Sequence, residues 1–179
     1  DGVGKIHLWD LERRAEAERF SAHLGSTLSA QWLPDGRILS SGHDGAKIWR
    51  ARHPGANQFK AYPGSLRCVA FSPDGKWIAA GERDGAGRVW EVATHGRVQL
   101  KLRGHVTTVT GLGFHPNGSR LVSCSRDGQV KVWDWKAEVE LLTLPLPGSG
   151  QAWHVAWSPD GSTIAAAGGD GLVTVWRAE

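Results

Sequence analysis

Two sequence markers recur together about every forty residues along this 179-residue chain. The first is a tryptophan that closes a short run rich in β-branched residues, and an Asp-Gly pair opens each of these runs. The tryptophans are Trp9, Trp49, Trp90, Trp133 and Trp176, so consecutive ones lie 40, 41, 43 and 43 residues apart. A period of this length is typical of proteins in which one supersecondary unit is repeated and each copy packs on its neighbours.

The second marker is a turn, Pro-Asp-Gly or Pro-Asn-Gly, that follows an apolar run ending in Trp32, Phe71, Phe114 or Trp157. Proline presets φ of one turn residue, Asp or Asn bonds its own backbone, and glycine supplies the positive φ that ends the turn. Each such turn predicts a tight hairpin, and each Asp-Gly pair predicts a second one. The run Gln129–Trp133 alternates polar and apolar residues, as a strand does. We therefore expect an all-β fold with about four strands per repeat.

The repeats resemble the WD40 repeat family of β-propellers over essentially the whole chain. The fullest copy contains Gly104-His105, the turn at His115-Pro116-Asn117-Gly118, Asp127-Gly128 and Trp133-Asp134. Of the five repeat tryptophans, only Trp9 and Trp133 are followed by the Asp of the name-giving pair. The resemblance implies a partial β-propeller, of about four blades, built from four-stranded antiparallel sheets.

The repeat boundaries predict five segments. Residues 1–23 would hold strands c and d of a truncated blade, residues 24–62, 63–103 and 104–146 three full blades, and residues 147–179 a last blade without its outer strand. This division predicts seventeen strands. The start on a strand c, without inner strands to cover it, suggests that N-terminal blades of a ring of about seven or eight blades precede this segment. The alternative is that two chains assemble to complete one ring.

The resemblance also implies buried polar tetrads that tie the loop between blades to strands b and c. The matching residues are His23, Ser40, Asp44 and Trp49 in one blade and His105, Ser123, Asp127 and Trp133 in another, with Ser125 as an alternative to Ser123. The other two blades carry Tyr62 and Ala80, or Gly148 and Ala166, at the His and Ser places. We therefore expect Asp84 and Asp170 to serve only their turns.

Ser, His and Asp together also invite a hydrolase interpretation, which the repetition argues against because one enzyme does not need the same triad twice. A satisfied buried hydrogen bond contributes about 0.5 to 1.5 kcal/mol, so a structural role is sufficient to explain the tetrads. The eight histidines never fall in metal-ligand spacing with Cys or acidic residues, and no glycine-rich segment stands between a strand and a helix. We therefore predict no catalytic residue, no metal site and no cofactor.

The recurring tryptophans, at the Trp49 and Trp157 positions of the repeats, are expected to be scaffold residues of the core. Positions that differ from repeat to repeat are instead free to contact a partner. Four residues before the strand-a aromatic stand Leu28, Arg67, Thr110 and Trp153, and before the Asp-Gly pairs stand His43, Arg83, Arg126 and Gly169. Arg and Trp dominate binding hot spots, so Arg67, Arg83, Arg126 and Trp153 are the candidate partner-binding residues, expected on one rim.

The resemblance implies a non-enzymatic scaffold whose partners are other proteins. An alternative is the regulatory C-terminal portion of a larger enzyme, such as a bacterial Ser/Thr protein kinase. The net charge of +3, from 21 Lys+Arg and 18 Asp+Glu, gives little support for a nucleic-acid partner. The chain has no apolar run long enough to cross a membrane, and Cys68 and Cys124 lie outside any C-x-x-C motif. These features predict a cytoplasmic protein without a membrane partner.

Overall fold

Each repeat forms an antiparallel sheet whose strands follow one another in chain order. The computed structural model describes residues 3–33, 35–50, 65–94, 98–148 and 150–177. The first two sheets are β1 (Lys5–Asp10) with β2 (Ala15–Ser21), and β3 (Thr27–Trp32), β4 (Arg37–Gly42) and β5 (Gly45–Arg50). The third sheet holds β6 (Leu66–Phe71), β7 (Trp77–Glu82), β8 (Gly87–Glu91) and β9 (Val98–Leu102). The fourth holds β10 (Val109–Phe114), β11 (Leu121–Ser125), β12 (Gln129–Asp134) and β13 (Val139–Pro145), and the fifth β14 (Ala152–Trp157), β15 (Thr163–Gly168) and β16 (Val173–Arg177).

The all-β prediction is confirmed, since a 3₁₀ turn at Val92–Thr94 is the one helical element in the described ranges. Those ranges contain sixteen strands. The expected outer strand of the segment 24–62 would fall in residues 51–64, which lie outside the described residues. Tyr62, expected at the His place of that repeat, lies there too.

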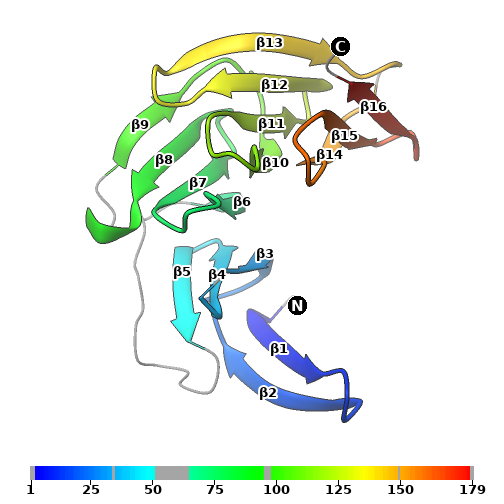
Figure 1. The fold of residues 1–179 in the computed structure, drawn as a ribbon. Coiled ribbons are helices and arrows are strands. Elements are labelled where there is room, and N and C mark those ends of the chain that lie inside the picture. The colour runs from blue at the N-terminus through cyan, green and yellow to red at the C-terminus, as the bar shows by residue number, and fades with distance from the viewer. Residues whose placement is uncertain (1–2, 34, 51–64, 95–97, 149, 178–179) are drawn as a thin grey trace.

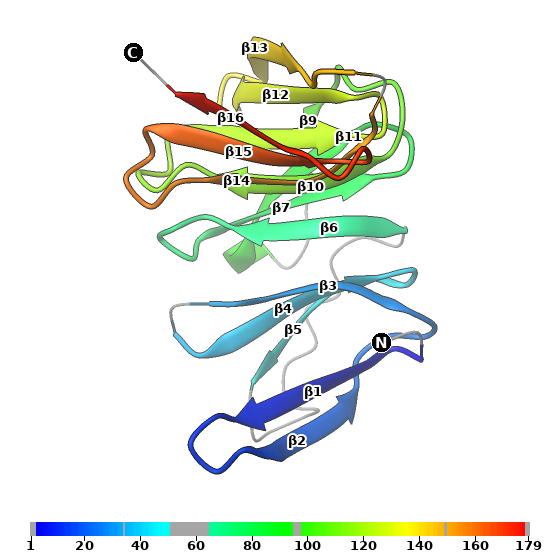
Figure 2. The same cartoon turned by 90° about the vertical axis from the view of Figure 1, so that its right-hand side faces the viewer.

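The sheets stack side by side into an open arc and do not close into a ring (Figure 1). The strands β3, β6, β10 and β14 lie on the inside of the arc, and β2, β9 and β13 lie on its outside (Figure 1). The four inner strands line a hollow of about 430 Å³. Turns between first and second strands lie at one end of the stacked sheets, and turns between second and third strands lie at the other (Figure 2).

The core consists of apolar layers between neighbouring sheets. One layer joins the second and third sheets, with Leu39, Ile48, Leu66 and Trp90 as fully buried or nearly buried members. Similar layers join the third sheet to the fourth and the fourth to the fifth. Because each layer is shared by two sheets, no sheet buries its apolar faces alone.

The turn chemistry predicted from the sequence is confirmed at both hairpins. Gly75 and Gly118, in the first hairpins, have φ of 68° and 74°, and Gly85 and Gly128, in the second, have φ of 85° and 78°. At Gly85 an added Cβ would lie 2.3 Å from the carbonyl oxygen of His105, so the neighbouring backbone also excludes a side chain there. All four positions therefore favour glycine for its conformation, and Gly85 requires it for space as well.

Two recurring tryptophans depart from the expected core role. Trp9 is 61% exposed and Trp32 is 56% exposed, whereas Trp49 and Trp133 at the Trp9 position of later repeats are buried. The first sheet contains β1 and β2 alone within the described residues, so it offers no inner strands to cover Trp32. Trp49 packs on residues of the preceding sheet, Ile6 and Phe20, and no described sheet precedes the one that carries Trp9. The prediction that every recurring tryptophan belongs to the core is wrong at these two positions.

Candidate functional site

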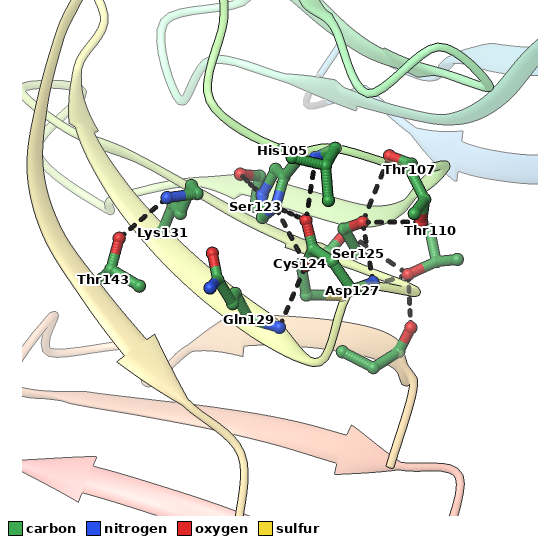
Figure 3. Close-up of polar contacts among 12 residues, drawn as sticks. His105, Thr107, Thr110, Ser123, Cys124, Ser125, Asp127, Gln129, Lys131 and Thr143 are labelled. Carbon is green, nitrogen blue, oxygen red and sulfur yellow. Dashed lines mark hydrogen bonds and ion pairs between the residues drawn. The ribbon is translucent and has the colours of Figure 1, made fainter. Parts of the chain in front are cut away.

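The structure brings His105, Ser123, Asp127 and Trp133 into one hydrogen-bonded chain, part of which is drawn in Figure 3. Trp133 Nε1 donates to Ser123 Oγ at 2.8 Å, Ser123 Oγ lies 2.8 Å from His105 Nε2, and His105 Nδ1 lies 3.0 Å from Asp127 Oδ2. An indole nitrogen can only donate and a carboxylate can only accept, so the chain has one consistent direction with a neutral imidazole. Ser123 donates to Nε2, and Nδ1–H donates to Asp127.

The same chain is built between the first and second sheets. Trp49 Nε1 donates to Ser40 Oγ at 2.8 Å, Ser40 Oγ lies 2.7 Å from His23 Nε2, and His23 Nδ1 contacts Asp44. Each Asp also accepts from the backbone N–H after its His, which is Leu24 for Asp44 and Val106 for Asp127, at 3.1 Å in both. The tetrads therefore fix the segment that enters each sheet to the turn between its second and third strands.

Burial sets the charge states within both tetrads. Burial lowers the pKa of His23 and of His105, and this outweighs the opposing attraction of Asp44 and of Asp127. Burial alone would raise the pKa of Asp44, but hydrogen bonds from Lys47, the Leu24 N–H and His23 hold it well below its usual range. Asp127 behaves alike, and the interaction with His105 leads among the effects that lower its pKa. The arrangement favours a neutral imidazole beside an ionised carboxylate.

Ser123 occupies the tetrad, and the alternative residue Ser125 does not. Ser125 Oγ donates to Thr107 O at 3.2 Å and accepts from Asp127 N at 3.2 Å, so it ties the same segment by a second route. Asp84 accepts from Ala86 N and Asp170 accepts from Leu172 N, both at 3.0 Å and within their own turns. The sheets that carry them have Ala80 and Ala166 at the Ser place.

The order of groups in each tetrad is that of a Ser-His-Asp triad, yet the serine cannot serve as a nucleophile here. Ser40 is fully buried and Ser123 is 4% exposed, so a substrate carbonyl cannot reach either Oγ. Each Oγ also accepts a hydrogen bond from an indole N–H, which reduces its nucleophilic character. These residues therefore hold the fold together through hydrogen bonds.

A lysine near each tetrad was not singled out by sequence reasoning. Lys47 Nζ donates to Asp44 at 2.8 Å and to Ala22 O at 2.7 Å. Lys131, at the same strand position two residues before the repeat tryptophan, bonds Glu140 and Thr143 instead, at 2.9 and 2.8 Å. Both lysines are buried. The signal was a charged residue in the middle of an apolar strand, because a buried charge requires a hydrogen-bonding partner.

The candidate partner-binding residues come together at the end of the sheets that carries the second-to-third strand turns. Arg67, Arg83 and Arg126 line a pocket of about 270 Å³ with Thr108, and we call these four residues the arginine pocket. Trp153 lies beside it, because the Arg126 guanidinium stacks over its ring at 5.0 Å. The side chain of Trp153 remains 40% exposed. The structure thus places four residues from three sheets in one region.

A β-bulge explains why the variable residue four positions before the strand-a aromatic can project outward. The register of the inner strand shifts in each of the four sheets that have one, and the residue skipped is Leu28, Arg67, Thr110 or Trp153. A bulged residue is unpaired in the ladder, and its side chain is redirected. Thr110 uses this freedom internally, because its hydroxyl donates to Ala152 O at 2.6 Å. The bulged residues Arg67 and Trp153 instead lie at the rim.

Among the described residues, no group of three or more His, Cys, Asp or Glu is arranged to hold a metal ion. No helix in those residues has the length and apolarity to cross a membrane. His43, at the position of Arg83 in an earlier repeat, contacts Ser65 Oγ at 3.1 Å.

Comparison with known proteins gives matches along most of the chain. The family model described as "WD domain, G-beta repeat" matches residues 56–91, 96–134 and 140–177, well over half of the sequence. Apoptotic protease-activating factor 1 of Rattus norvegicus is 31% identical over 93 residues, or 50% of this chain. Pre-mRNA-splicing factor PRP46 of Eremothecium gossypii is 37% identical over 62 residues, or 34% of this chain.

A third relative, the serine-threonine kinase receptor-associated protein of Homo sapiens, is 32% identical over 66 residues, or 35% of this chain. The matched regions make up 7%, 14% and 19% of the three relatives in the order given. The similarity therefore concerns repeats within longer proteins.

Proposed function

This chain belongs to the WD40 repeat family, and from that premise we propose that it is a non-enzymatic scaffold that binds other proteins at the arginine pocket and Trp153. WD40 domains generally mediate protein–protein interactions, and they are typically non-catalytic. The observation that carries the proposal is the convergence of Arg67, Arg83 and Arg126 on one pocket beside a half-exposed tryptophan. Arg and Trp are the residue types that most often dominate binding energy at protein interfaces.

The rest of the structure supports a rigid platform. The sheets share apolar layers, and the tetrads bind the connecting segments to the turns, so the groups at the rim are held in place before a partner arrives. A preorganised surface loses less conformational freedom on binding, which favours affinity. The proposal extends to a cytoplasmic partner, in keeping with Cys68 and Cys124 as free, buried thiols.

The test is affinity capture from cells that make the protein, followed by titration of each purified partner against variants. We expect Arg83→Glu and Trp153→Ala each to lower the affinity for the partner by about tenfold or more, because the loss of a hot-spot side chain costs about 2 kcal/mol or more of binding free energy. The matched control is Arg13→Glu, in the β1–β2 turn at the opposite end of the sheets, where the side chain is 85% exposed (Figure 2). A partner that binds the two rim variants as tightly as the wild type would overturn the proposed surface.

A further inference from the structure

The charge of the arginine pocket is uncompensated. Three guanidinium groups line it and no carboxylate does. Within the described ranges, Arg67, Arg83 and Arg126 take part in no ion pair, whereas Arg88 is paired with Glu82 at 2.7 Å and Arg120 with Asp134 at 3.1 Å. Arginine stays protonated at any physiological pH, so the three positive charges persist and repel one another. An anion in the pocket would relieve this repulsion.

The acidic residues next to these arginines in sequence are already engaged elsewhere. Asp84 follows Arg83 and accepts from Ala86 N, and Asp127 follows Arg126 and accepts from His105 and Val106 N. Both carboxylates are therefore committed to the fold. The arginine before each one remains available to a ligand.

Thr108 and Trp153 hold two of the arginines in place. Arg126 N donates to Thr108 O at 3.1 Å, and Thr108 Oγ1 donates to Arg83 O at 3.4 Å, so one residue ties both turns. The Arg126 guanidinium lies over the Trp153 ring, 5.0 Å from its centroid, and this cation–π contact holds the charged group at the pocket. A guanidinium is the group that binds carboxylate and phosphate oxygens in a bidentate manner.

We propose that the arginine pocket binds an anionic side chain, a carboxylate or a phosphate, presented by an extended peptide segment of a partner protein, while Trp153 packs on the neighbouring peptide residue. This inference rests on the proposed function and specifies the chemistry of the partner. The pocket is small, about 270 Å³, and its charged lining consists of three arginines, which suits one anionic group. A nucleic-acid strand instead presents a continuous row of phosphates. A peptide therefore suits the site better than a nucleic-acid strand does.

The test uses three peptide libraries that are degenerate around a fixed central phosphoserine, glutamate or serine, and a single-stranded oligonucleotide. Binding is measured by fluorescence anisotropy for the wild type, the double variant Arg83→Ala/Arg126→Ala and the control Arg13→Ala. We expect the phosphoserine or the glutamate library to bind and the serine library to fail. The affinity of the double variant for the anionic library should fall by about tenfold or more, because hydrogen bonds to charged groups are among the strong ones. The affinity of the control should equal that of the wild type. The tighter of the two anionic libraries identifies the source of the anion.

Three results would overturn the proposal: equal binding of the serine library, an equal loss in the Arg13 control, or tighter binding of the oligonucleotide with a steep dependence on salt. Matching melting temperatures establish that the variants are folded. If purified partners require Arg83 and Trp153 while neither anionic library binds, the pocket chemistry fails and the proposed function stands. If an anionic library needs the pocket while partners ignore it, the proposed function fails and the pocket chemistry stands.

Discussion

Replacement of His105 by alanine tests how much the tetrad contributes to stability. The imidazole is 1% exposed and makes hydrogen bonds to Ser123 and to Asp127. His105→Ala removes both bonds, leaves the Ser123 hydroxyl hydrogen without its acceptor, and opens a cavity in the place of the ring. Asp127 keeps the backbone donors Val106 N and Gln129 N, which limits the cost at that end.

The magnitude follows from these losses. Each net hydrogen bond contributes about 0.5 to 1.5 kcal/mol, and a buried group left without a partner adds about 1 kcal/mol or more. We therefore expect the free energy of unfolding to fall by about 3 kcal/mol. In a protein of this size, 1 kcal/mol corresponds to about 2 to 4 °C, so the melting temperature should fall by about 6 to 12 °C.

The matched control is His154→Ala, because His154 is exposed on β14 and belongs to no tetrad. His95 also stands outside the tetrad positions, but it lies outside the described residues. Differential scanning calorimetry of the wild type and both variants at pH 7 should show a shift of about 2 °C or less for the control. Equal melting temperatures for the two variants would refute the reasoning that the tetrad stabilises the fold.

Two further predictions concern acid and glycine. Because burial lowers the folded-state pKa of His23 and His105, the unfolded chain binds more protons just below pH 6.5, so the melting temperature should decrease as pH falls from 7 to 5; an increase would contradict the neutral tetrad. Gly85→Ala should lower the free energy of unfolding by about 2 kcal/mol or more, because φ is 85° and the new Cβ would meet the His105 carbonyl. At Gly113 an added Cβ meets nothing within 4 Å, so Gly113→Ala should change the free energy of unfolding, measured by urea denaturation, by about 1 kcal/mol or less.

The features that could be predicted from the sequence are local or repeated. The turn at Pro73-Asp74-Gly75 is set by the conformational preferences of its own residues, and its glycine has positive φ as expected. The residues of both tetrads followed from a family pattern that recurs at fixed offsets. The common rim of Arg83 and Arg126 followed from their equal position in successive repeats, because equivalent residues of stacked sheets lie at the same end.

The features that could not be predicted depend on contacts between strands or sheets that no fixed spacing encodes. Lys47 donates to Asp44, three residues earlier in the sequence, whereas Lys131 donates to Glu140 on the neighbouring strand of the β12–β13 pair. The exposure of Trp32 depends on what the preceding sheet offers to cover it. The stacking of Arg126 on Trp153 joins two sheets, and the sequence indicated only that both residues belong to one rim.

The bulge in each inner strand links the scaffold to its surface. A regular strand commits each side chain to one face or the other, whereas the bulged position is released from that alternation. The repeats fill this position with Leu28, Arg67, Thr110 and Trp153, and the outcome depends on the residue. Thr110 turns inward and joins its sheet to the next through Ala152 O, while Arg67 and Trp153 reach the rim. A variable repeat position is thus available to a partner only where the residue placed there makes no hydrogen bond inside the fold, as Thr110 does.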